Sequence, residues 1–146
     1  MNAFSFWNLF TSDVVTAIAS VVLVIFSIMS WVVIIAKIRM FSAARRHKPT
    51  GNPDVAIKPF DKNLWFLAMV TYVSPFIGLF GTVWGVMDSF AAIGANQSVS
   101  IGVIAPGLAV ALGTTALGLI VAIPAAIAHQ VFVKKADDLY DALGGK

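Results

Sequence analysis

Residues 78–87 read GLFGTVWGVM, and they decide the fold because three glycines interrupt a strongly apolar stretch of the chain. Each glycine lowers helix stability by about 1 kcal/mol relative to alanine. Gly78, Gly81 and Gly85 lie three or four residues apart, so they share one helix face, which also carries Thr82. Lipid tails give helices no hydrophobic reason to associate, and close backbone approach through small residues takes its place. The stretch therefore predicts a membrane helix that packs tightly against another helix.

A second face of the same kind follows further along the chain. Its small residues are Gly107, Ala111, Thr114 or Thr115, Gly118 and Ala122. The two faces predict that the helices carrying them pack on each other or on further copies of the chain. A threonine in a membrane helix also bonds back to the carbonyl four residues earlier. Spacing alone therefore leaves open whether Thr82 and Thr115 only help the helices to pack or also have a functional role.

The composition places the chain in a membrane. Of its 146 residues, 59% are hydrophobic and only 12% are charged, and the mean hydropathy is +0.88. A soluble domain of this length exposes too much of its mass to water to hide so much apolar surface. The apolar segments are long enough for helices, and no alternating pattern of barrel strands is visible. We expect an all-α integral membrane protein.

Three segments carry no Asp, Glu, Lys or Arg: residues 14–36, 63–87 and 99–133. About 20 apolar residues cross the hydrocarbon core, so each segment is long enough to span it. The third would be about 50 Å long as a helix. We therefore expect a turn or more of it to emerge, on the side of His129.

Basic residues set the predicted orientation. Seven lie between Lys37 and Lys62, and Lys134, Lys135 and Lys146 follow the third span, whereas residues 1–13 and 94–98 have none. Positive charge stays in the cytoplasm, so the N-terminus faces outward and the C-terminus is cytoplasmic. Residues 1–13 lack the basic start of a cleaved signal, and their aromatic side chains indicate an interfacial arm.

The sequence therefore divides into seven predicted segments. They are a periplasmic interfacial arm (1–13), transmembrane helix 1 (14–36), a short irregular cytoplasmic loop (37–62), transmembrane helix 2 (63–93), a periplasmic loop (94–98), transmembrane helix 3 (99–133) and a cytoplasmic tail (134–146) that is able to extend the third helix.

Several function classes find no support. The chain has no cysteine, and His47 and His129 have no Cys or Glu companions, so we expect no metal site and no cofactor. The basic residues flank apolar segments, which indicates topology signals rather than a nucleic-acid surface. No nucleophile–base pair or phosphate loop is visible, so we expect no enzyme. A small-molecule transporter is a weak alternative, because inverted repeats and a buried charge are missing.

Asp88, near the outer end of the second span, is the only acidic residue that touches a span. Ionisable residues inside a membrane usually have a functional role, and the predicted spans of this chain contain none near the middle of the membrane. Any proton chemistry here must take its titrating group from another chain.

Three stretches together, SPFIGLFGTVWGVMDSF (74–90), ANQSVSIGVIAPGLAVAL (95–112) and TALGLIVAIPAAIAHQ (115–130), resemble the TolQ/ExbB family, which is related to the MotA stator proteins. The N-terminal FWNLF and SWVVIIAKI look more like TolQ than ExbB. The run GLFGTVWG, APG and TALGL is much more specific than any single small-residue pattern. The resemblance covers most of residues 4–45 and 63–133.

The resemblance implies a proton-channel subunit of the bacterial inner membrane. Five copies would surround two transmembrane helices of a TolR- or ExbD-like partner, each with one membrane aspartate. Thr82 and Thr115 match the family's pore threonines, and a hydroxyl both donates and accepts hydrogen bonds. Proton flow through such a complex would drive mechanical work at the cell envelope.

The chain departs from the family at two places. The family's glutamate five residues before the second threonine is matched here by Val110, so a carboxylate of the proton path is missing. We expect either impaired conduction or compensation by Thr114 through water. The loop between spans one and two is also much shorter than in the family. The chain looks like a minimised TolQ-like membrane core, and a non-conducting oligomeric scaffold is the alternative function.

Overall fold

The computed structural model describes residues 14–46, 53–96 and 101–144, which form four α-helices and no strand. The helices are α2 (Val14–Arg46), α3 (Pro53–Asp61), α4 (Leu64–Asn96) and α5 (Ile101–Ala142). Three of them, α2, α4 and α5, are long and apolar enough to cross a membrane. The all-α architecture with three membrane-spanning helices is thereby confirmed. The arm expected at residues 1–13 lies outside the described residues.

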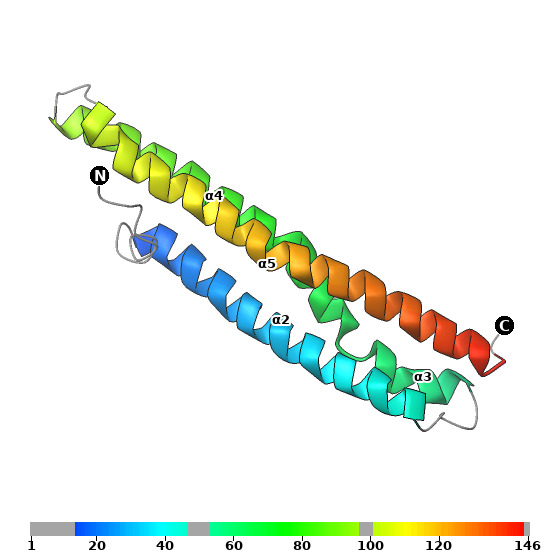
Figure 1. The fold of residues 1–146 in the computed structure, drawn as a ribbon. Helices are drawn as coiled ribbons and strands as arrows, with labels where there is room; N and C mark the ends of the chain where they lie inside the picture. The colour runs from blue at the N-terminus through cyan, green and yellow to red at the C-terminus, as the bar shows by residue number, and fades with distance from the viewer. Residues whose placement is uncertain (1–13, 47–52, 97–100, 145–146) are drawn as a thin grey trace.

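Figure 1 shows how the helices are arranged. α4 and α5 lie side by side along their length, and α2 runs beside this pair. The short α3 sits between the end of α2 and the C-terminal part of α5. α4 and α5 therefore form the closest helix pair of the fold, and α2 is a looser third member.

The helices extend beyond the predicted spans at the end that carries most of the lysines. α2 continues from the span at 14–36 to Arg46, and α5 continues from 99–133 to Ala142. The extension of the third helix into the tail is the one that the sequence predicted. The extension of α2 replaces the first part of the predicted loop, because its alanines, arginines and methionine are good helix formers.

The prediction of an irregular loop is also wrong at α3. Pro53 opens this helix, where its missing N–H is not needed, and Asp54 lies in its first turn. Lys58 lies in the last turn, where a cation complements the helix dipole. Asn63 then adopts φ 67°, a left-handed conformation that asparagine tolerates, and the chain turns from α3 into α4.

A buried lysine fastens α3 to α2. The Nζ of Lys37 donates hydrogen bonds to the carbonyl oxygens of Pro59 at 3.1 Å and Phe60 at 2.6 Å. These carbonyls belong to the last turn of α3, which has no helical donors of its own. Only 4% of Lys37 is exposed, so its ammonium group serves as the cap of a neighbouring helix.

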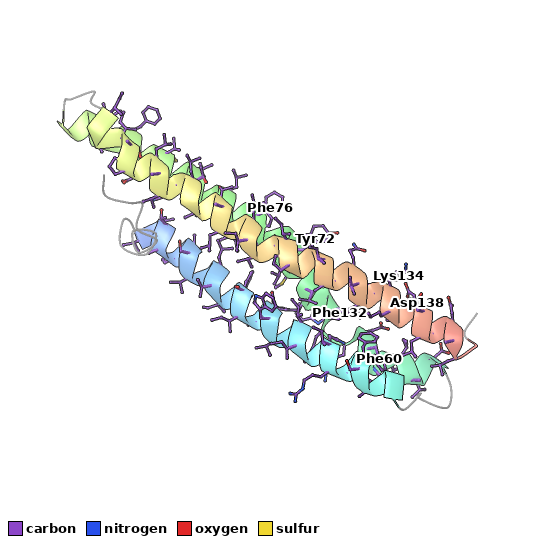
Figure 2. All side chains as sticks on the ribbon, viewed as in Figure 1. Phe60, Tyr72, Phe76, Phe132, Lys134 and Asp138 are labelled. Carbon is purple, nitrogen blue, oxygen red and sulfur yellow. The ribbon has the colours of Figure 1, made fainter. Side chains whose placement is uncertain are left out.

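Aromatic rings fill the space between α2, α3 and α5. The ring of Phe41 stacks on Phe132, with centroids 5.8 Å apart and planes 5° apart, and lies 4.9 Å from the Phe60 ring. Figure 2 shows Phe60 and Phe132 inside this end of the bundle. All three side chains are buried. We call Phe41, Phe60 and Phe132 the aromatic cluster.

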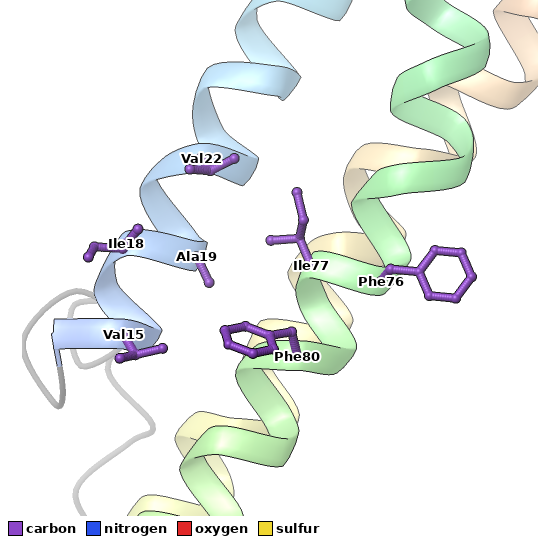
Figure 3. Close-up of a pocket in the computed structure, with 7 residues that line it drawn as sticks. All are labelled: Val15, Ile18, Ala19, Val22, Phe76, Ile77 and Phe80. Carbon is purple, nitrogen blue, oxygen red and sulfur yellow. The ribbon is translucent and has the colours of Figure 1, made fainter.

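α2 separates from α4 near its N-terminal end. Figure 3 shows the resulting cleft of about 440 Å³, into which Ile77 and Phe80 point from α4. Val15 and Ala19 form part of the opposite wall on α2. All seven lining residues are apolar, so the cleft suits a hydrocarbon environment.

The outer surface of the bundle is apolar as well. Tyr72 and Phe76 are each 70% exposed and Ile120 is 64% exposed, and Figure 2 shows the first two on the outside of the bundle. In water such a large apolar surface would favour aggregation. In a bilayer it is the expected lipid-facing side.

Candidate functional site

The candidate site lies where the backbones of α4 and α5 come close together. A Cβ atom added at Gly78 would lie 2.8 Å from the carbonyl oxygen of Thr114 and 3.0 Å from the Cα of Thr115. A Cβ at Gly118 would lie 2.7 Å from the carbonyl oxygen of Ser74. These contacts are backbone to backbone, so only glycine fits at both positions.

The other small residues continue this interface in both directions. A Cβ at Gly81 would meet the side chain of Thr114, and a Cβ at Gly85 would lie 2.8 Å from the Cβ of Ala111. Gly107 faces the hydroxyl of Ser89 in the same way. Ala122 is also buried, at 5% exposure. The structure thus brings the two small-residue faces together within one chain.

Thr82 of α4 and Thr115 of α5 meet at this interface. Their Oγ1 atoms are in direct hydrogen-bond contact. Thr82 Oγ1 also lies 2.9 Å from the carbonyl oxygen of Ala111, and Thr115 Oγ1 lies 3.2 Å from that of Gly78. The two threonines are 33 positions apart in the sequence, and they meet because Gly78 and Gly81 let the helices approach so closely.

The hydroxyl pair has two consistent arrangements of its protons. In one, Thr82 donates to Thr115, and Thr115 donates to the carbonyl of Gly78. In the other, Thr115 donates to Thr82, and Thr82 donates to the carbonyl of Ala111. Each hydroxyl has one proton and two acceptor lone pairs. The pair is therefore able to reverse the direction of its hydrogen bonds without losing one.

Thr114 occupies a different place from its neighbour. Its side chain has no exposed surface, and its Oγ1 donates to the carbonyl of Ala111 at 2.6 Å. Thr82 and Thr115 are only partly buried. Thr114 is thus enclosed between α4 and α5, whereas the other two hydroxyls lie at the edge of the interface.

The position matched to the family's glutamate lies on another side of α5. Val110 is 6% exposed, and its separation of five residues from Thr115 corresponds to roughly 140° around the helix. It does not share the partly exposed edge on which Thr82 and Thr115 meet. A carboxylate at this position would enter the interior of the bundle.

Acidic and metal-binding groups are scarce around the pair. Asp88 lies on α4, and its side chain is exposed. Among the described residues, no group of three or more His, Cys, Asp or Glu side chains is placed to hold a metal ion. The chemistry of this site is therefore that of hydroxyl groups and backbone carbonyls.

Sequence reasoning missed two serines of the interface. Ser89 Oγ donates to the carbonyl of Gly85 at 2.8 Å, and Ser74 is fully buried with no hydrogen-bond partner for its Oγ. Ser74 lies four residues before Gly78 and Ser89 lies four residues after Gly85, so both serines extend the same helix face by one turn. The spacing of four residues was the signal that could have identified them.

Known proteins resemble this chain over more than half of its length. The MotA/TolQ/ExbB proton channel family matches residues 54–143. The Biopolymer transport protein ExbB of Salmonella typhimurium is 46% identical over 79 residues, which are 54% of this chain and 32% of that protein. The Tol-Pal system protein TolQ of Pseudomonas aeruginosa is 47% identical over 79 residues, 54% of this chain and 34% of that protein. The chain thus matches about a third of the length of these relatives.

Proposed function

The chain belongs to the MotA/TolQ/ExbB proton channel family, and we propose that it is a proton-channel subunit of the bacterial inner membrane. In this proposal several copies, most simply five, form a ring around the transmembrane helices of a TolR- or ExbD-like partner. Proton flow through the ring moves the partner and so performs work at the cell envelope. The single observation that carries the proposal is the contact between Thr82 and Thr115.

The two hydroxyls suit a proton path because they hold no charge of their own. A partner carboxylate that passes them is neutral when protonated, which removes most of the cost of placing it in an apolar channel. The reversible hydrogen bonds of the pair offer such a carboxylate either a donor or an acceptor. Each copy in the ring would contribute one complete pair, since both threonines come from one chain.

Thr114 takes a supporting role in this proposal. Its buried side chain lies beneath Gly81 and bonds to the carbonyl of Ala111. It therefore fixes the spacing of α4 and α5, while Thr82 and Thr115 face the pore. Compensation for the missing carboxylate by Thr114 through water stays a prediction.

The test measures proton flux in proteoliposomes that contain the chain and a TolR- or ExbD-like partner. Thr115→Val removes one hydroxyl with little change of shape, and we expect the flux to fall at least tenfold while the complex still assembles. Thr71→Val is the matched control, because Thr71 Oγ1 donates a hydrogen bond within its own helix, to the carbonyl of Leu67 at 2.8 Å. Equal flux in the two variants would refute the role of the pair.

A non-conducting scaffold is the second candidate function, and Val110 favours it because no carboxylate stands there. The same assay separates the two functions. A partner complex of the unmodified chain that assembles but carries no flux above empty vesicles identifies a scaffold. Measurable flux shows that the hydroxyl pair conducts without the glutamate.

A further inference from the structure

A groove of about 430 Å³ lies between α2 and α5, toward the C-terminal ends of both helices. Trp31 and Ile38 belong to its α2 wall, and Pro124 and Ala128 belong to its α5 wall. The lining is apolar apart from Lys135, which lies at one end. The groove thus has a hydrocarbon-like interior with a single cationic residue at its mouth.

The length of the groove matches one leaflet of a membrane. From Pro124 to Lys135 the α5 wall rises about 16 Å at 1.5 Å per residue. Half of the hydrocarbon core of a bilayer is about 15 Å thick. Lys135 also follows directly on the uncharged stretch at residues 99–133 and Lys134. Its ammonium group therefore lies at the level of the lipid headgroups when the rest of the groove lies among the acyl chains.

The aromatic cluster helps to place this ammonium group. Lys135 Nζ lies 6.0 Å from the centroid of the Phe41 ring, which belongs to the opposite helix. The negative face of an aromatic ring attracts a cation at this distance. The side chain of Lys135 thus reaches across from α5 toward α2, over the end of the groove.

We propose that this groove binds one anionic phospholipid of the leaflet that borders Lys135. An acyl chain lies along Trp31 and Ala128, and the phosphate group contacts the ammonium of Lys135. Charge complementarity selects the occupant, because a lysine near a membrane surface favours anionic lipid about fivefold. The cleft of Figure 3 has only apolar lining residues, so nothing in it distinguishes one headgroup from another.

The experiment uses the fluorescence of Trp31, which is 53% exposed and lines the groove. Replacing the other tryptophans (Trp7→Phe, Trp65→Phe and Trp84→Phe) leaves Trp31 as the only one. The full chain is placed in phosphatidylcholine vesicles that contain a small fraction of brominated lipid, which quenches tryptophan on contact. Brominated phosphatidylglycerol is compared with brominated phosphatidylcholine.

We expect the brominated phosphatidylglycerol to quench Trp31 at about a fifth of the lipid fraction that the phosphatidylcholine needs. Lys135→Gln should abolish this preference, and Ala128→Leu, which fills the groove, should weaken quenching by both lipids. Lys134→Gln is the matched control, since it removes the same charge one position earlier, outside the groove lining. It should keep the preference.

Three results would overturn the proposal. Equal quenching by the two lipids in the parent chain would show that the groove does not select a headgroup. Equal loss of preference in the Lys134→Gln and Lys135→Gln variants would show a diffuse surface charge rather than a site. No quenching by either lipid would show that protein, such as a second copy of the chain, covers the groove.

Discussion

Gly78 is the residue on which the candidate site depends most directly. It lies under the backbone of Thr114 and Thr115, and its carbonyl oxygen accepts a hydrogen bond from Thr115. A methyl group at this position meets backbone atoms that have no freedom to rotate away. The two helices must then separate by some tenths of an ångström, which also separates the hydroxyl pair.

We therefore expect Gly78→Ala to destabilise the fold by about 1–3 kcal/mol, the usual cost of overpacking. Gly94→Ala is the control, because no atom lies within 4 Å of a Cβ added there, and alanine is the better helix former. Unfolding in detergent, followed by circular dichroism, gives both free energies. A Gly78→Ala variant as stable as Gly94→Ala would contradict the assigned contact.

The hydroxyl pair illustrates what the sequence was able to predict at this scale. Spacing placed Thr82 on the face of Gly78 and Gly81, but no local pattern relates it to Thr115 far along the chain. The resemblance to a family supplied that pairing. The match of Val110 to a family glutamate also came from the resemblance, and the structure adds that this side chain is buried within the chain.

At the scale of elements, the helices that cross the membrane were the predictable ones. Each carries a long uncharged run, and the small residues on α4 and α5 repeat at the helical period. α3 was missed because it has nine residues and a proline near its end. Its stability comes from residues far away in the sequence, among them Lys37, which donates to its last carbonyls, and Tyr140, whose hydroxyl bonds to Asp54 at 3.2 Å.

We expect Lys37→Met to release α3 from α2. Methionine keeps most of the side-chain volume but removes both hydrogen bonds to the carbonyls of Pro59 and Phe60. Hydrogen bonds to a charged group contribute about 1.5–3 kcal/mol, so the amides of α3 should exchange with deuterium at least tenfold faster. Lys58→Met, at an exposed position of α3, removes only a charge that complements the helix dipole, so it should change the exchange much less. Similar exchange in both variants would show that Lys37 does not hold the helix.

At the scale of the whole molecule, orientation in the membrane stays a prediction. It rests on the positions of lysine and arginine along the chain. The structure adds that the start of α2 lies at the same end as the end of α4 and the start of α5, away from α3 (Figure 1). These three helix ends should therefore lie on one side of the membrane.

Single cysteines test this orientation directly, because the chain has none of its own. We expect a maleimide that cannot cross membranes to label Ile101→Cys in intact spheroplasts, since Ile101 is 84% exposed at the start of α5. Ala142→Cys, at the other end of the same helix, should react only after the cells are opened. The reverse pattern would invert the predicted topology.

The length of α5 has a consequence for how the bundle responds to solvent. Its 42 residues make a rod of about 63 Å, roughly twice the hydrocarbon thickness of a bilayer. One continuous helix thus crosses the hydrocarbon core and extends into the aqueous phase. Between α4 and α5 the cohesion is close backbone contact, which does not depend on water. The last turns of α5 lie beyond that thickness and contact α3, where the hydroxyl of Tyr140 bonds to Asp54 at 3.2 Å; packing that is exposed to water depends on the ordinary hydrophobic effect, which urea weakens. A denaturant dissolved in the buffer should therefore loosen the end of α5 that contacts α3 before it affects the contact between α4 and α5.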